Sequence, residues 1–125
     1  MNLNIINSNK EELFPFPFDS AKNFVLGEEY KLNLIFVDSQ KMLELNSKYR
    51  NLNHSTDILS FPLEIDSGEI YMCIDEAKKE APKFDRNLDT FIPFLFIHGL
   101  VHLKGYDHGS KMESIEAEAR EKFGV

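Results

Sequence analysis

Two patterns of apolar residues follow one another along this chain. In some segments apolar and polar residues alternate, and in others apolar residues recur every three or four positions. Four segments predict strands, at residues 2–5, 30–37, 58–63 and 69–74. In the second strand, Leu32, Leu34 and Phe36 share one face. The last two strands are expected to be joined by a turn at Asp66-Ser67-Gly68.

Helical spacing accounts for most of the remaining residues. Five helices are expected, at about residues 20–26, 39–50, 75–81, 90–104 and 110–123. The Phe-Pro-Phe-Pro-Phe run at residues 14–18 delays the first helix, because proline lacks a backbone donor. In the second helix, Met42, Leu45 and Tyr49 form the inward stripe, and the Asp38-Ser39 pair supplies the N-cap.

The fourth of these helices is the most apolar. It is hydrophobic on nearly every side, so it is expected at the centre of the fold. Thr90 is its expected N-cap, Pro93 falls in its first turn and Gly105 ends it. The fifth helix opens with Ser110 and Glu113, which have the spacing of a capping box.

Strands and helices interleaved in this way predict an α/β (α+β) fold, in which helices cover a mixed sheet of about four strands. Asp75 is the expected N-cap of the third helix, and Pro82 stops that helix. A chain of 125 residues supports one hydrophobic core, so residues 1–125 are expected to form a single domain.

Composition and charge narrow the class of protein. Hydrophobic residues make up 42% and charged residues 28%, which excludes disordered, collagen-like and coiled-coil chains. The net charge is −7, so any nucleic acid must bind to a local basic groove. We expect no membrane span and no secretory signal, and we expect the single cysteine, Cys73, to lie in the core. These features favour a cytoplasmic protein.

Three of the four histidines lie near the end of the apolar helix. His98 and His102 are four residues apart, so they project from one helix face at about 40° to each other. The helix-ending Gly105 lets the chain reverse and return His108 to the same point. Three imidazoles with an open fourth position are typical of a catalytic zinc site. Asp107 is placed either to orient a ligand imidazole or to form a turn.

The spacing His-x-x-x-His-x-x-Gly-x-x-His is that of the metzincin proteases, but Gly99 stands where their glutamate base would be. Residues 98–108, His-Gly-Leu-Val-His-Leu-Lys-Gly-Tyr-Asp-His, instead closely resemble the signature of the bacterial YbeY family. A second segment is also similar to that family, with Leu45-Asn46, Tyr49-Arg50 and then Thr-Asp-Ile-Leu-Ser-Phe-Pro at residues 56–62. The resemblance spans about residues 41–121.

This resemblance implies a metal-dependent endoribonuclease that cleaves single-stranded RNA in ribosomal RNA maturation and ribosome quality control. It implies that His98, His102 and His108 hold one Zn²⁺ ion and that Arg50 is catalytic, since a guanidinium binds phosphate bidentately. The implied partner is the ribosome or a ribosomal protein, which would direct a chain of low intrinsic RNA affinity to its substrate. The nucleophile stays open between water and the RNA 2′-hydroxyl.

Two other functions are compatible with the same residues. A noncatalytic zinc-containing ribosome-assembly factor would use the metal to tie the last helices together, and Arg50 would only complete the C-terminus of its helix. A metzincin-like hydrolase of a non-RNA substrate would need a base from outside position 99. Lys48 and Lys104 are the candidate cations for an RNA groove, and His54 either faces substrate or lies in a solvated loop.

Overall fold

The computed structural model describes residues 2–7, 16–105 and 109–125. The strands in these ranges are β1 (Leu3–Asn7), β2 (Lys31–Phe36), β3 (Ile58–Glu64) and β4 (Ser67–Met72). The helices are α1 (Phe18–Leu26), α2 (Ser39–Arg50), α3 (Ile74–Glu80), α4 (Leu88–Leu103) and α5 (Ser110–Phe123), and a short 3₁₀ helix, η1 (Ala81–Phe84), follows α3. The predicted number and order of strands and helices are confirmed.

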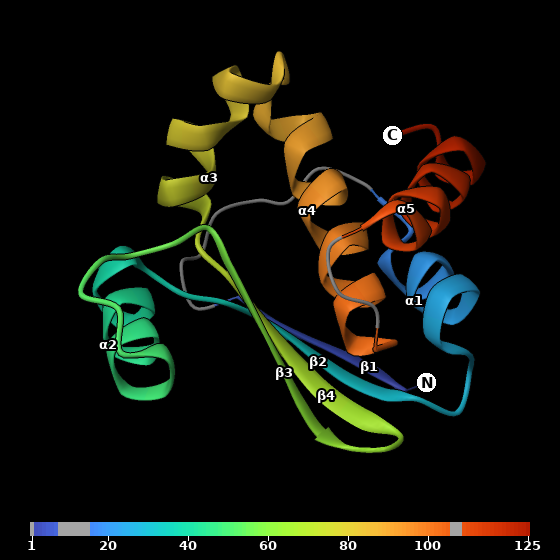
Figure 1. The fold of residues 1–125 in the computed structure, drawn as a ribbon, viewed down its shortest axis with the longest axis horizontal. Helices are drawn as coiled ribbons and strands as arrows, with labels where there is room; N and C mark the ends of the chain where they lie inside the picture. The colour runs from blue at the N-terminus through green and yellow to red at the C-terminus, as the bar shows by residue number, and fades with distance from the viewer. Residues whose placement is uncertain (1, 8–15, 106–108) are drawn as a thin grey trace.

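The four strands form one mixed sheet in the order β1-β2-β4-β3 (Figure 1). β2 pairs in parallel with both β1 and β4, whereas β3 pairs with β4 in antiparallel. The single α+β domain with a mixed sheet is therefore as predicted. Since β3 is an edge strand, residues from both faces of the sheet can meet around it.

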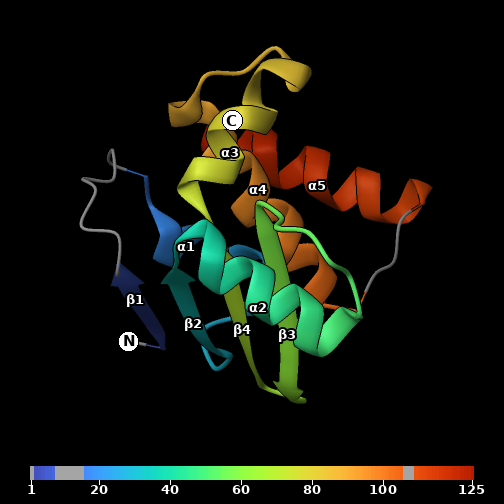
Figure 2. The same cartoon turned by 90° about the vertical axis from the view of Figure 1, so that its left-hand side faces the viewer.

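Helices cover both faces of this sheet (Figures 1 and 2). α1, α4 and α5 lie on one face, where the alternate residues Leu32, Leu34 and Phe36 of β2 are buried, as the pattern predicts. On the other face α2 packs Met42 and Leu45 onto the sheet in a smaller cluster. The two clusters together form the hydrophobic core of the domain.

α4 runs through the centre of the fold, as its composition predicts. Ten of its 16 residues are buried, so almost no face of it is left for solvent. Its N-cap is Asn87 and not Thr90, because the Asn87 side chain accepts a hydrogen bond of 3.1 Å from the Thr90 backbone N–H. α4 therefore begins earlier than predicted, and Pro93 lies beyond its first turn.

α1 begins at Phe18, whereas the sequence predicted a start at about Ser20. Proline restricts the residue before it, so Pro17 leaves Phe18 free to adopt helical angles. Phe18 also shares one helix face with Ala21 and Val25, and all three are buried. Burial of this stripe extends the helix back to Phe18.

Several other local predictions were wrong where packing overrides a turn or capping signal. The turn between β3 and β4 lies at residues 65–66, because Ser67 and Gly68 continue the strand. Asp75 lies within the first turn of α3, which begins at Ile74 after Cys73.

The inward stripe of α2 and the start of α5 also differ from the prediction. Tyr49 is 57% exposed, and Asn46 is buried in its place. The buried Asn46 amide is satisfied, because it donates a hydrogen bond of 2.8 Å to the carbonyl of His54. Ser110 is the first residue of α5 and not its cap, a position that Gly109 takes.

Gly68 lets the last turn of α4 lie close to β4. A Cβ at this position would be 2.5 Å from Tyr30 Oη, 3.0 Å from Leu103 Cδ2 and 3.1 Å from the Phe61 carbonyl oxygen. The Tyr30 hydroxyl is buried and has no hydrogen-bond partner among the described residues. The contact between α4 and the sheet therefore depends on the missing side chain at position 68.

We expect Gly68→Ala to lower the free energy of unfolding in urea by about 1–3 kcal/mol, because an extra methyl group overpacks this contact. The penalty should shrink in a Tyr30→Phe background, since the nearest clashing atom is then gone. Tyr30→Phe alone should not lower stability, because it removes a buried hydroxyl that lacks a partner. An equal penalty in both backgrounds would show that the Tyr30 hydroxyl does not limit the space at position 68.

Candidate active site

His98 and His102 lie one turn apart in the C-terminal half of α4 and face each other. Their Nε2 atoms are 3.1 Å apart, and the ring centroids are 4.6 Å apart with perpendicular planes. Both side chains are only partly buried, so the pair lies where the buried helix reaches the surface. The predicted common face of these two histidines is confirmed.

Glu116 of α5 fixes the orientation of the His98 ring. Its Oε1 atom lies 2.5 Å from His98 Nδ1, and Glu116 is 8% exposed. A carboxylate accepts this hydrogen bond, so Nδ1 carries the hydrogen and the lone pair of a neutral ring is on Nε2. The His98 nitrogen that faces His102 is therefore the one suited to bind a cation.

Arg50 and the two histidines line one cavity of about 390 Å³. Its other lining residues come mainly from one face of β3 and from the end of α4: Ile58, Ser60, Pro62 and Leu103. Arg50 is the last residue of α2, which covers the opposite face of the sheet. The structure thus brings the predicted arginine to the predicted histidine pair around the edge strand.

The geometry of the histidine pair fits two ligands of one metal ion. Two nitrogens bound to zinc at 2.0–2.1 Å in a tetrahedral arrangement lie about 3.3 Å apart, close to the 3.1 Å observed here. The described residues contain no group of three His, Cys, Asp or Glu that could hold a metal. The third predicted ligand, His108, and its neighbour Asp107 lie outside the described residues.

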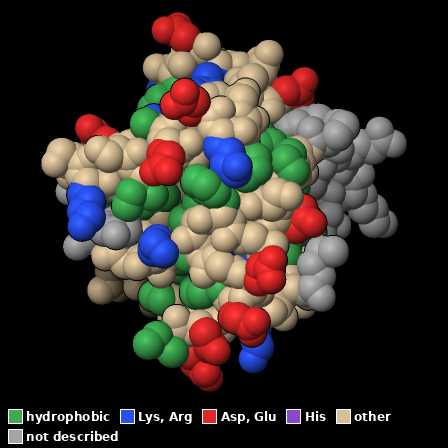
Figure 3. Space-filling model, turned by 90° about the vertical axis from the view of Figure 1, so that its right-hand side faces the viewer, with side chains coloured by type: hydrophobic (Ala, Val, Ile, Leu, Met, Phe, Trp, Pro, Cys, Tyr) green, Lys and Arg blue, Asp and Glu red, His purple; other side chains and the backbone are tan. Residues whose placement is uncertain are grey.

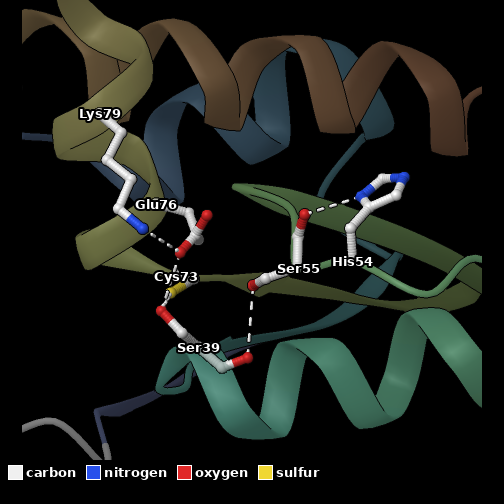
Figure 4. Close-up of polar contacts among 6 residues, drawn as sticks. All are labelled: Ser39, His54, Ser55, Cys73, Glu76 and Lys79. Carbon is white, nitrogen blue, oxygen red and sulfur yellow. Dashed lines mark hydrogen bonds and ion pairs between the residues drawn. The ribbon is translucent and has the colours of Figure 1, made fainter.

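His54 and Cys73 lie away from this cavity. Figure 4 shows the contacts where α2 and α3 begin: Ser39 Oγ donates to the Glu76 carboxylate at 3.0 Å and is 3.5 Å from Cys73 Sγ. Ser55 Oγ donates to the Ser39 carbonyl at 3.3 Å, and His54 Nδ1 contacts the Ser55 carbonyl at 3.0 Å. Cys73 is buried as predicted, and His54 is an exposed loop residue.

Charged side chains are interspersed on the surface in view in Figure 3. On this face, basic groups are scattered singly among more numerous acidic groups and form no continuous patch. Lys48 and Lys104, which are exposed, do not line the cavity. None of the described helices is long and apolar enough to cross a bilayer.

Glu116 is the site residue that the sequence interpretation missed. The sequence analysis gives it no role, yet Met112, Glu116 and Ala119 are the buried residues of α5. Spacings of four and three residues place position 116 on the inward stripe. An acidic residue at an inward position next to a predicted metal site is the signal that would have identified it.

Fold and cavity together define a single α+β domain whose central helix presents paired histidines to an arginine-lined cavity. The family model described as "Endoribonuclease YbeY" matches residues 4–124, and the chain belongs to the YbeY family of endoribonucleases. The Endoribonuclease YbeY of Acholeplasma laidlawii is 37% identical over 98% of this chain and 90% of that protein. That of Nautilia profundicola is 44% identical over 72% of this chain and 68% of that protein.

A solved structure has the same fold. The solution structure of TM1509 from Thermotoga maritima superposes with a TM-score of 0.66 at 26% sequence identity. The match covers 98% of this chain and 89% of that one. The family model and the curated relatives confirm the predicted family resemblance, and the solved structure confirms the predicted fold.

We expect Glu116→Ala to lower the free energy of unfolding by about 1.5–3 kcal/mol, because it removes a partly buried charge-assisted hydrogen bond to His98. Glu118→Ala is the matched control, since Glu118 is exposed on the same helix and should change stability by less than about 0.5 kcal/mol. Chemical denaturation of the two variants checks this. Equal stability would show that the hydrogen bond to His98 adds nothing.

Proposed function

We propose that this chain is a metal-dependent endoribonuclease that cleaves single-stranded RNA during ribosomal RNA maturation and ribosome quality control in the cytoplasm. The observation that carries this proposal is the placement of Arg50 in one cavity with the facing His98 and His102 nitrogens. Membership of the YbeY family supports RNA as the substrate.

The proposed metal site consists of His98, His102 and His108, with one zinc ion per chain. The 3.1 Å separation of the first two nitrogens and the Glu116 hydrogen bond to His98 support this assignment. A bound zinc ion would polarise a phosphoryl oxygen and acidify a water molecule. Within the same cavity, the Arg50 guanidinium would bind the phosphate bidentately and stabilise the charge that develops on it.

The packing of Gly99 supports RNA over peptide as the substrate. A Cβ at this position would lie 3.0 Å from Ile58 Cδ1, 3.1 Å from Ile70 Cδ1 and 3.1 Å from Ser60 Oγ. Position 99 therefore faces the sheet, and the tight packing there disfavours a glutamate base of the metzincin type. An arginine in the cavity suits an anionic phosphodiester better than a neutral peptide.

The acidic charge of the chain supports a partner that brings the enzyme to RNA. With a net charge of −7, sequence-independent attraction to RNA is weak outside the Arg50 cavity. The exposed Lys48 and Lys104 would add cations beside it. The ribosome or a ribosomal protein is the partner that we propose for this targeting.

We expect the purified chain to bind one metal ion, measured by inductively coupled plasma mass spectrometry after dialysis against metal-free buffer. His98→Ala and His102→Ala should each lose it, because two remaining imidazoles hold zinc poorly. His54→Ala should keep it, since His54 lies apart from the cavity. Full metal occupancy in both helix variants would rule out this metal site.

Arg50→Ala should reduce kcat/KM on a 5′-labelled single-stranded RNA by about 100-fold or more, with the unfolding curve unchanged because Arg50 is exposed. Arg50→Lys should recover only part of the activity, since an ammonium cannot bind phosphate bidentately. Lys41→Ala, on the exposed side of the same helix, is the control.

The assembly-factor function makes the opposite prediction for these variants. If Arg50→Ala and His102→Ala both cleave RNA like the wild type, the activity comes from a contaminating nuclease. The metal would then have only a structural role. Product ends would show the nucleophile, because attack by the 2′-hydroxyl leaves a cyclic phosphate and attack by water does not.

A further inference from the structure

A second cavity, of about 440 Å³, adjoins the Arg50 cavity. The two cavities share Ile58 and His98 in their linings. The second one extends from His98 toward α5 and the 3₁₀ helix η1, and none of the functions assigned above uses it. A substrate bound at Arg50 and the histidine pair would have this cavity as its immediate neighbour.

The two cavities differ in the charge of their linings. Among the described residues that line the first cavity, Arg50 is the one with a permanent positive charge, and none has a carboxylate. The second cavity is lined by Asp57, Glu113 and Glu116, and by no described lysine or arginine. The lining of the first cavity therefore suits a phosphate better than the lining of the second, which holds three carboxylates. The part of a nucleotide that suits the second cavity is therefore its base.

An aromatic ring is available there for a base to stack on. Phe84 is 52% exposed and lines the cavity, and its ring contacts those of Phe91 and Phe94 at centroid distances of 5.3 and 5.6 Å. Phe94 is already engaged by cations, since the Arg86 and Arg120 guanidinium carbons lie 4.5 and 5.4 Å from its centroid. Phe84 thus combines two ring contacts with a half-exposed side chain, and exposed aromatic side chains are the groups on which bases of single-stranded nucleic acids stack.

Asp57 offers a hydrogen-bond acceptor in the same cavity. Burial raises the pKa of its carboxyl group, and the nearby Glu80 carboxylate adds to this effect. The Asp57 and Ile58 backbone N–H groups and the Thr56 hydroxyl, at 3.5 Å, donate to it. Three donors leave this carboxylate with acceptor capacity, because its two oxygens take about four hydrogen bonds. A ligand with N–H donors would fill that capacity.

We propose that this cavity is a nucleobase-binding subsite beside the scissile phosphate, in which a base stacks on Phe84 and donates its N–H groups to Asp57. The inference rests on the function proposed above. Guanine fits best, because its N1–H and amino group present two adjacent donors to the remaining acceptor capacity of Asp57. Uracil fits worst, because its Watson–Crick edge places two carbonyl oxygens against an acidic wall. Asp57 and Phe84 are therefore specificity-determining residues.

The first test measures binding without cleavage. Guanosine 5′-monophosphate and uridine 5′-monophosphate carry the same phosphate, so any difference between them reports on the base. In ¹H–¹⁵N spectra of the full chain, we expect the guanine nucleotide to shift Phe84 and Asp57 and to bind about tenfold more tightly. Equal affinity, or shifts confined to the surroundings of Arg50, would overturn the proposal.

Variants separate the two contacts. Asp57→Asn should remove most of the guanine preference, and Phe84→Ala should weaken both nucleotides several-fold. Asp89→Asn, an exposed residue in the first turn of α4 that lines neither cavity, is the matched charge control. Phe84 is half exposed, so its variant keeps the proposal testable even if Asp57→Asn fails to fold.

The second test uses cleavage of short RNAs that differ only in the bases next to one cleavage site. The ratio of kcat/KM for guanine over uracil at one flanking position should fall about tenfold in Asp57→Asn and stay unchanged in Asp89→Asn. Cleavage without any base preference would overturn the subsite while the endoribonuclease function stands. Selective guanine binding without cleavage of any RNA would overturn the endoribonuclease function while the base-binding subsite stands.

Discussion

The burial of α4 against the sheet holds the rest of the structure in place. This helix is apolar on nearly all sides, so it is stable only between the sheet and the helices around it. Its C-terminal turns emerge at the edge strand β3, and that is where His98 and His102 meet Arg50. Gly68 and Gly99 allow the close approach, since a Cβ would lie 2.5 Å from Tyr30 Oη at position 68 and in tight contacts of 3.0–3.1 Å at position 99. The site is thus a direct consequence of how the core packs.

The His98 side chain on α4 is oriented by a residue of α5. α5 packs against α4 and turns the Glu116 carboxylate inward to His98. A buried carboxylate is costly without a partner, and a histidine at a helix surface is free to rotate without one. The hydrogen bond therefore gives the Glu116 carboxylate a partner and fixes the orientation of the His98 ring. This pairing couples the stability of the C-terminal helix to the geometry of the site.

An acidic chain can belong to a family of endoribonucleases because its positive and negative groups line different cavities. The Arg50 cavity holds a cation and imidazoles, whereas the adjoining cavity holds carboxylates and an exposed phenyl ring. A nucleotide has the same division between its anionic phosphate and its flat base with N–H donors. Net charge therefore says little about the substrate, because the two halves of a nucleotide meet different surfaces.

Local patterns in the sequence determined the order of strands and helices, the burial of α4 and the common face of His98 and His102. These depend on spacing within one segment, which the backbone geometry converts into direction. Tertiary structure alone decided that Arg50 reaches the histidines, that Glu116 faces inward and that Asp57 and Phe84 share a cavity. Such contacts join segments far apart in the chain, and their side chains meet only after the sheet and helices have packed. Packing also moved the start of α1, because burying Phe18 outweighed the local signals, whereas the earlier start of α4 comes from a local cap at Asn87.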